Sequence, residues 1–232
     1  MSIGMINDLI SFFFPSYCIH CAERLPADRK LICEECFDLL PKYRGHEAYY
    51  APEERINGLI PFTELQSDLI FTRTNTTRKI IHKIKYHNTP DVAYHLSRSF
   101  ALEHKRSGHF SDVSAIVPVP LAPYRMKKRG YNQSEFIAKG LAEVYGLPIE
   151  KDFLKRENSK TGTQTSRGKE ERWREIYGAF YVSEDQDLKG RRILVVDDVL
   201  TTGATIVNAG RALLGAGAEA VSFYTLALDI LL

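Results

Sequence analysis

Residues Ile193–Thr205 read ILVVDDVLTTGAT, and this stretch decides the fold. The apolar run Ile193–Val196 indicates a strand that is buried on both faces, as strands of parallel sheets are. Asp197 and Asp198 follow it, and the run Thr201–Thr205 then opens a helix. A strand, a polar loop and a helix in this order form the unit from which α/β folds are built.

The loop of this unit has the composition of a phosphate-binding site. Backbone N–H groups at the start of a helix are unpaired, and the helix dipole favours a dianion there. Gly203 permits a close approach of the backbone, and the carboxylates of Asp197 and Asp198 suit vicinal hydroxyl groups one sugar length away. The pattern therefore predicts a site for a ribose 5-phosphate group. The loop residues expected to bind it are Thr201, Thr202, Gly203, Ala204 and Thr205.

Three other phosphate-binding or signalling motifs do not fit the chain. A P-loop requires GxxxxGK[ST], and a dinucleotide-binding fold requires GxGxxG after an early strand; both are missing from the sequence. ILVVDD also resembles the start of a receiver domain, which would need about a hundred further residues, whereas 34 follow Asp198. A buried strand with an ordinary polar turn does not account for both the acid pair and TTGAT.

The rest of the chain from about Leu59 alternates short apolar runs with helical segments, which predicts a mostly parallel sheet covered by helices. Strands are expected at 65–71, 113–117, 191–196 and 220–227, and helices at 76–86, 91–105, 133–145 and 204–215. Ligands of such sheets bind beyond the carboxyl ends of the strands. The segments 118–133, 157–172 and 197–205 are expected at these ends.

All the cysteines lie near the N-terminus, in two CxxC pairs that are eleven residues apart: Cys18, Cys21, Cys33 and Cys36. Two such turns complete a tetrahedral shell for zinc, and four protein ligands leave no position for water, so the metal is expected to be structural. Two disulfides or a redox pair are the alternatives, and His20 is an alternative ligand. We therefore expect a small zinc ribbon with four cysteine ligands, and a reducing cytoplasm as its location.

Two units follow from these patterns. Residues 1–48 are expected to hold a short amphipathic helix over 3–14 and the zinc ribbon, and residues 49–232 the α/β domain, with the polar stretch Lys42–Glu54 as the linker. No apolar run approaches the roughly 20 residues that span a membrane. The net charge of +2 does not by itself indicate a nucleic-acid binder. Two basic clusters, Arg73–Lys85 and Arg125–Arg129, suit phosphates, nucleic acid or simply a solvated face.

Several motifs together carry a resemblance to a known family. Asp197–Thr205 resembles the phosphoribosyl pyrophosphate (PRPP) motif of type I phosphoribosyltransferases, and the whole chain resembles the ComF family of competence-related proteins. The further motifs are the paired CxxC module, Ile84-Lys85-Tyr86, Val117–Leu121 with Arg125 and Arg129–Gln133, and Arg156 with Thr161, Gln164 and Arg172. The family often has leucine where Arg167 stands and asparagine where Glu175 stands.

The resemblance implies a fold and a set of site residues. It implies that Asp197 and Asp198 hold the ribose hydroxyls of PRPP and that Thr201–Thr205 hold its 5-phosphate, with Mg²⁺ bound alongside the pyrophosphate. Arg125 and Arg129 would then neutralise the leaving pyrophosphate, where fixed cations help most. The polar stretch 158–168 suits a loop that closes over the site, or an ordinary surface loop.

Two functions of different classes fit this resemblance, which also implies a part in DNA uptake during natural transformation. In the first, the protein is an enzyme that transfers ribose 5-phosphate from PRPP to a nitrogenous acceptor. In the second, it is a non-catalytic adaptor that binds single-stranded DNA, or other DNA-uptake proteins, and keeps the PRPP site as a sensor or structural element. The basic clusters with Tyr86, Tyr124 and Tyr131 nearby would bind a strand by charge and stacking.

Overall fold

The computed structural model describes residues 17–25, 32–44, 51–74, 76–156 and 180–230. The strands are β1 (Leu65–Phe71), β2 (Ala115–Pro118), β3 (Lys155–Arg156), β4 (Phe180–Tyr181), β5 (Arg192–Leu200) and β6 (Ala220–Asp229). The helices are α2 (Glu34–Asp38), the 3-10 turn η2 (Pro52–Arg55), α3 (Thr76–Tyr86), α4 (Asp91–Arg106), α5 (Pro123–Arg129), α6 (Gln133–Tyr145) and α8 (Ala204–Gly215).

Four strands form the main sheet in the order β1-β6-β5-β2, and every neighbouring pair is parallel. The two central strands, β5 and β6, are almost wholly buried because their apolar residues face helices or turns on both sides of the sheet. A parallel arrangement places the carboxyl ends of all four strands at one edge. The segments that follow β2 and β5, which the sequence singles out, therefore meet there.

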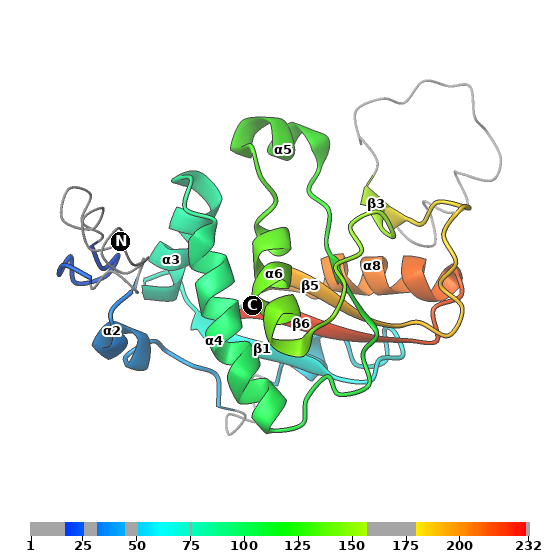
Figure 1. The fold of residues 1–232 in the computed structure, drawn as a ribbon, viewed down its shortest axis with the longest axis horizontal. Helices are drawn as coiled ribbons and strands as arrows, with labels where there is room; N and C mark the ends of the chain where they lie inside the picture. Colours follow the sequence, from blue (N-terminus) through cyan, green and yellow to red (C-terminus); the bar gives the residue numbers. More distant parts are fainter. Residues whose placement is uncertain (1–16, 26–31, 45–50, 75, 157–179, 231–232) are drawn as a thin grey trace, which may run out of the picture.

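The sheet is the middle of three layers (Figure 1). Alternate residues of β5 and β6, such as Val196 and Tyr224, pack with α3, α4 and α6 on one face. Their neighbours Val195 and Phe223 pack with α8 and with Ile56 and Ile60, which follow η2, on the other. Two apolar cores thus hold the sheet from opposite sides, and the site-bearing loops extend from a rigid base.

Helices 76–86, 133–145 and 204–215 have the bounds that the sequence predicts. For α6 the physical reason is visible, since the side chain of Asn132 accepts a hydrogen bond from the N–H of Ser134 at 3.1 Å. The helix then ends at Gly146, whose φ of 72° suits a residue without a side chain.

Two expectations were wrong at the sheet edge that carries the site. β5 does not end at Val196 but runs to Leu200, because β6 provides ladder partners as far as Leu228. The helix α5 was not predicted at all: none of its residues is buried, so it lacks the apolar spacing that predicts a helix. Pro at the start of α5 and Gly130 at its end are what define it.

The N-terminal module is attached to the sheet, where the sequence suggests a linker. The N–H of Tyr43 donates to the carbonyl of Asp68 at 2.6 Å, and that of Ile70 donates to the carbonyl of Pro41 at 2.7 Å. Residues 41–43 therefore run antiparallel along the outer edge of β1. The expected helix 3–14 and the boundary between residues 48 and 49 lie outside the described residues.

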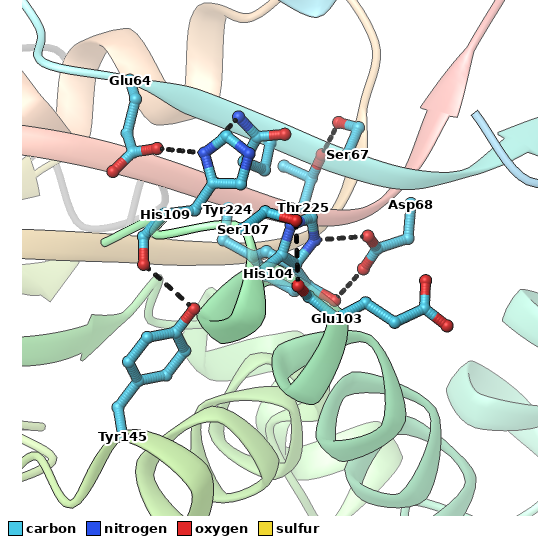
Figure 2. A network of polar contacts seen from close by, with 11 residues as sticks. Glu64, Ser67, Asp68, Glu103, His104, Ser107, His109, Tyr145, Tyr224 and Thr225 are labelled. Atoms are coloured by element: carbon cyan, nitrogen blue, oxygen red, sulfur yellow. Dashed lines mark hydrogen bonds and ion pairs between the residues drawn. The ribbon is translucent and has the colours of Figure 1, made fainter. Parts of the chain in front are cut away.

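A polar network ties β1 and β6 to the end of α4 (Figure 2). The buried carboxylate of Asp68 lies 2.6 Å from His104 Nε2 and also accepts a hydrogen bond from the hydroxyl of Tyr224. Burial raises the pKa of Asp68. Burial acts to lower the pKa of His104, but the hydrogen bond and charge of Asp68 raise it above its ordinary value. The pair forms a buried electrostatic contact between helix and sheet.

Within the described residues, no helix combines the length and the apolar character that a membrane crossing requires.

Candidate functional site

The acid pair lies on the last half of β5. Asp198 is buried, with 5% of its surface exposed, whereas Asp197 is half-buried. One carboxylate oxygen of Asp197, Oδ1, accepts hydrogen bonds from Ser134 Oγ at 3.1 Å and from the N–H of Asp198 at 2.8 Å. Burial and the charge of Asp198 raise the pKa of Asp197 to about 7. Asp197 therefore changes its protonation near neutral pH.

The threonine loop follows the acid pair directly and opens α8. Gly203 adopts the left-handed conformation, with φ 80°, at the N-cap of this helix, and its carbonyl accepts the N–H of Val207 at 3.0 Å. Gly203 has no side chain to cap the helix, and the N–H of Ala204 makes a long hydrogen bond of 3.4 Å to Thr202 Oγ1. The N-terminus of α8 is the positive end of the helix dipole, where an anion is favoured. The hydroxyl-bearing residues of the loop, Thr201, Thr202 and Thr205, are exposed around it.

Arg55, the last residue of η2, forms hydrogen bonds that hold this loop in place. Its guanidinium donates to the carbonyl of Thr201 at 3.1 Å and to the carbonyl of Asp229 at 2.9 Å. One rigid, always-charged group therefore holds the loop after β5 to the end of β6. Arg55 is 146 residues from Thr201 along the chain, and no motif in the sequence links the two.

A cation-lined cavity of about 570 Å³ lies between the end of α3 and α5. Its described lining residues include no acid and are Lys85, Tyr86, Asn88, Tyr124, Arg125, Lys128, Arg129 and Tyr131. Arg129 donates to Gln133 Oε1 at 2.5 Å and stacks on Tyr86, with its guanidinium carbon 5.3 Å from the ring centre. The structure thus gathers Arg125 and Arg129, both singled out from the sequence, around one polar cavity.

Two observations connect this cavity to the acid pair. Lys85 Nζ lies 2.8 Å from Asp198 Oδ2 and also lines the cavity. Burial and the charge of Arg125 lower the pKa of Arg156, while the charge of Asp197 opposes this, so Arg156 lies within electrostatic range of both. The acid pair, the threonine loop and the cations therefore belong to one region at the carboxyl edge of the sheet.

The sequence places Lys85 in the basic cluster Arg73–Lys85, which was expected to bind phosphates or nucleic acid or to be a solvated face. The structure shows a different position for its side chain. Its side chain is about one-quarter exposed and is directed at Asp198, whereas Lys79 on the same helix is exposed. The two partners are 113 residues apart, and the motif Ile84-Lys85-Tyr86 was the one feature that could have marked it.

The four cysteines, far apart in two pairs in the sequence, form one cluster. Their sulfur atoms all lie within 4.8 Å of one another, and Cys21 Sγ is 3.8 Å from Cys33 Sγ. Zinc–sulfur bonds of about 2.3 Å in a tetrahedron require sulfurs about 3.8 Å apart. Burial acts to raise the pKa of Cys18, but backbone hydrogen bonds from Cys21 and Cys33 lower it to about 6, while the neighbouring thiol of Cys33 raises the pKa of Cys36. The cluster can therefore hold a metal ion such as zinc.

Some expected site residues lie outside the described residues. They belong to the proposed closing loop, 158–168, and to the positions Thr161, Gln164, Arg167, Arg172 and Glu175.

The larger part of the α/β domain matches a known family. Residues 110–230, more than half of the chain, match the family described as phosphoribosyl transferase domain. Two solved structures show low similarity. Glutamine phosphoribosylpyrophosphate amidotransferase from B. subtilis is 20% identical, with 62% of this chain and 30% of that chain covered and a TM-score of 0.44. For adenine phosphoribosyltransferase from Saccharomyces cerevisiae the identity is 14%, the coverage 61% and 71%, and the TM-score 0.39.

One curated relative matches nearly the whole chain, and two others match about two thirds of it. Competence protein F of Haemophilus influenzae is 28% identical over 225 residues, which cover 93% of this chain and 98% of that protein. DNA utilization protein YhgH of Escherichia coli is 31% identical over 150 residues, 63% of this chain and 65% of that protein. Competence protein ComFC of Bacillus subtilis is 27% identical over 165 residues, 69% and 63% of the two chains. The resemblance to the ComF family is therefore confirmed, and the chain belongs to the phosphoribosyl transferase domain family.

Proposed function

We propose that this protein binds PRPP, or ribose 5-phosphate, at the carboxyl edge of its sheet. One observation carries the proposal: an acid pair at the end of β5 and the N-terminus of α8 follow each other in one chain segment, beside a cavity lined by cations. The three parts match, in order, the ribose hydroxyls, the 5-phosphate and the pyrophosphate of PRPP. Asp197 and Asp198 would accept the hydroxyl hydrogens, and Thr201–Thr205 would donate to the phosphate.

Arg125 and Arg129 on α5 would face the pyrophosphate. Mg²⁺ would enter with PRPP as the counter-ion of that group, since pyrophosphate oxygens are ligands that Mg²⁺ prefers. If the protein is an enzyme, the bond between ribose C1 and the pyrophosphate oxygen breaks and its electron pair leaves with the pyrophosphate. The two arginines would then stabilise the charge that develops there, while a nitrogenous acceptor forms the new bond to C1.

Ligand-induced stabilisation tests this proposal. A ligand that binds only the folded state raises the melting temperature by mass action, so we expect ribose 5-phosphate, and PRPP with Mg²⁺, to raise it. A wild-type protein whose melting temperature is unchanged by millimolar PRPP would exclude the proposed site. Pyrophosphate release from PRPP, measured with nucleobases and with single-stranded DNA added in turn, then separates the enzyme from a protein that only binds.

We further propose that the protein acts in DNA uptake, and a specific observation favours the adaptor as the second candidate function. Tyr86 and Tyr124 are exposed to 59% and 57%, and both line the cationic cavity. Exposed aromatic rings beside cations form the kind of surface on which single strands stack. The printed names of the relatives, competence and DNA utilization proteins, support the same context.

The DNA experiment must leave Lys85 unchanged, because that residue is paired with Asp198. We therefore choose the double variant Lys79→Gln/Lys83→Gln on α3. If these lysines contact phosphates, each lost contact should lower the slope of log K against log salt by about 0.7, whatever the base sequence. An unchanged slope would place strand binding elsewhere, and no binding at low salt would reject the adaptor.

We also propose that Cys18, Cys21, Cys33 and Cys36 hold one structural zinc ion in a reducing cytoplasm. The donor set and the sulfur separations support this assignment. Bound zinc would supply folding energy to a module with few buried residues, and no step of the chemistry at β5 involves it.

A further inference from the structure

Lys85 lies before residues 110–230, which match the phosphoribosyl transferase domain, and the motif Ile84-Lys85-Tyr86 by itself assigns it no role. It stands on the last turn of α3, and this turn is fixed from outside. The hydroxyl of Tyr131 donates to the carbonyl of Ile84, and the guanidinium of Arg129 stacks on Tyr86. The helix end that carries Lys85 is therefore held against α5 and its following loop.

The ammonium of Lys85 neutralises the buried end of the acid pair. Its Nζ lies 2.8 Å from Asp198 Oδ2, but the contact lacks hydrogen-bond geometry, and Oδ2 has no hydrogen-bond partner among the described residues. A buried carboxylate oxygen that has an ion-pair partner but no well-aligned donor is an incomplete arrangement. It suits an atom that is to receive a hydrogen bond from a ligand when the lysine moves.

The same ammonium also lies at the wall of the cationic cavity, beside Arg125, Lys128 and Arg129. A lysine has three donors on a flexible stem, so it can exchange one anionic partner for another at small geometric cost. Lys85 thus contacts Asp198 and also lines the cavity that would take a pyrophosphate.

We propose that Lys85 is the residue by which this site distinguishes PRPP from ribose 5-phosphate, an inference that rests on the proposed function. Binding of the ribose hydroxyls at Asp198 displaces the ammonium from Oδ2. PRPP offers that ammonium a new anionic partner, the pyrophosphate on C1. Ribose 5-phosphate offers only a hydroxyl at C1, so the lost ion pair is not replaced. Specificity then comes from an exchange of ion-pair partners.

The test compares two ligands on three proteins by isothermal titration calorimetry. Wild type should bind PRPP with Mg²⁺ more tightly than ribose 5-phosphate. In Lys85→Gln, PRPP affinity should fall about 10- to 100-fold, as expected for a lost charge-assisted contact, while ribose 5-phosphate affinity stays equal or rises. Lys79→Gln, an exposed lysine on the same helix, should match wild type for both ligands.

Each other outcome counts against the inference. An equal loss for both ligands in Lys85→Gln would mean that Lys85 merely supports the fold of the site. Unchanged PRPP affinity would mean that it does not meet the pyrophosphate. If Lys85→Gln does not fold by circular dichroism, Lys85→Arg, which keeps the charge, should retain the preference for PRPP, and its loss would overturn the assignment. A wild-type protein that binds neither ligand would instead reject the proposed function.

Discussion

The backbone of Gly203 lies against the side chain of Ile56, so closely that a Cβ on Gly203 would stand 2.5 Å from Ile56 Cγ2. The threonine loop therefore rests on the residue that follows η2, and η2 also provides Arg55. The segment Arg55–Ile56 therefore fixes the shape of the loop in two ways: Ile56 contacts Gly203, and the guanidinium of Arg55 donates to the carbonyl of Thr201.

Gly203→Ala should destabilise the protein and weaken ribose 5-phosphate binding, because the new methyl group displaces Ile56 and the residue keeps an unfavourable positive φ. We expect a loss of about 1–3 kcal/mol in the free energy of unfolding, measured by chemical denaturation. Gly146→Ala is the matched control, since Gly146 has φ 72° but nothing within 4 Å of its added Cβ. Equal effects at the two positions would show that the contact with Ile56 is unimportant.

Arg55→Ala should lower the affinity for ribose 5-phosphate, because the carbonyls of Thr201 and Asp229 lose a shared donor. The loss in the free energy of binding should exceed the loss in the free energy of unfolding. A loss of about tenfold in affinity corresponds to one hydrogen bond from a charged group. Arg211→Ala removes a similar bond, to the carbonyl of Leu59 at 2.8 Å, and should leave affinity unchanged. Calorimetric titration of both variants checks this, and added guanidinium should partly restore binding in Arg55→Ala alone.

Asp197→Asn should weaken ribose 5-phosphate binding. Without ligand, it should stabilise the folded protein near neutral pH, because it removes a partly buried negative charge. The folded pKa of about 7 lies above the ordinary 3.8, so the stability that Asp197 contributes is fully present below about pH 4 and lost as the pH rises through 7. The difference in melting temperature between variant and wild type should therefore grow in favour of the variant from pH 5 to pH 8. A difference that does not change with pH would contradict the raised pKa.

His104→Gln should show the opposite dependence on pH. The folded pKa of His104 lies above its ordinary 6.5, so its contribution to stability is fully present below pH 6.5 and lost as the pH rises through the folded value. The variant should therefore be most destabilised, by about 1–3 kcal/mol, at pH 5.5 to 6.5. Arg98→Gln, which breaks an exposed ion pair with Glu143, should change stability little and without this dependence. Urea denaturation across pH 5.5–9 measures both.

Cys33→Ser should lose the metal. We expect about one zinc per chain in wild type by elemental analysis of protein purified without chelators, and substantially less in the variant, with a lower melting temperature because metal binding and folding are coupled. His20→Ala should keep its zinc, since the cluster of four sulfurs does not include His20. Wild-type protein free of zinc would contradict the assignment.

Much of the fold follows from local patterns in the sequence. The bounds of α3, α6 and α8 could be predicted because apolar spacing and caps are local, as Asn132 and Gly146 show for α6. The acid pair and the threonine loop were found for the same reason, since they lie within nine consecutive residues.

The residues that were missed act across long separations. Arg55 reaches Thr201 and Lys85 reaches Asp198, and in each case the position of the partner depends on how β5 and β6 are packed in the sheet. α5 was missed for another reason: a helix without a buried face has no apolar period to detect. Contacts between charged residues far apart in the sequence, and helices without a buried face, could therefore not be predicted from this sequence alone.

The strand-like segment at residues 41–43 gives the cysteine module a protective role. β1 is an edge strand of the main sheet, and the outer backbone groups of an edge strand are the kind that recruit another chain when nothing covers them. Two backbone hydrogen bonds from Tyr43 and to Pro41 occupy that edge, and the ring of Phe37 lies 5.4 Å from that of Phe100 on α4 behind it. Removal of the residues up to 43 would uncover this edge of β1 as a template for self-association.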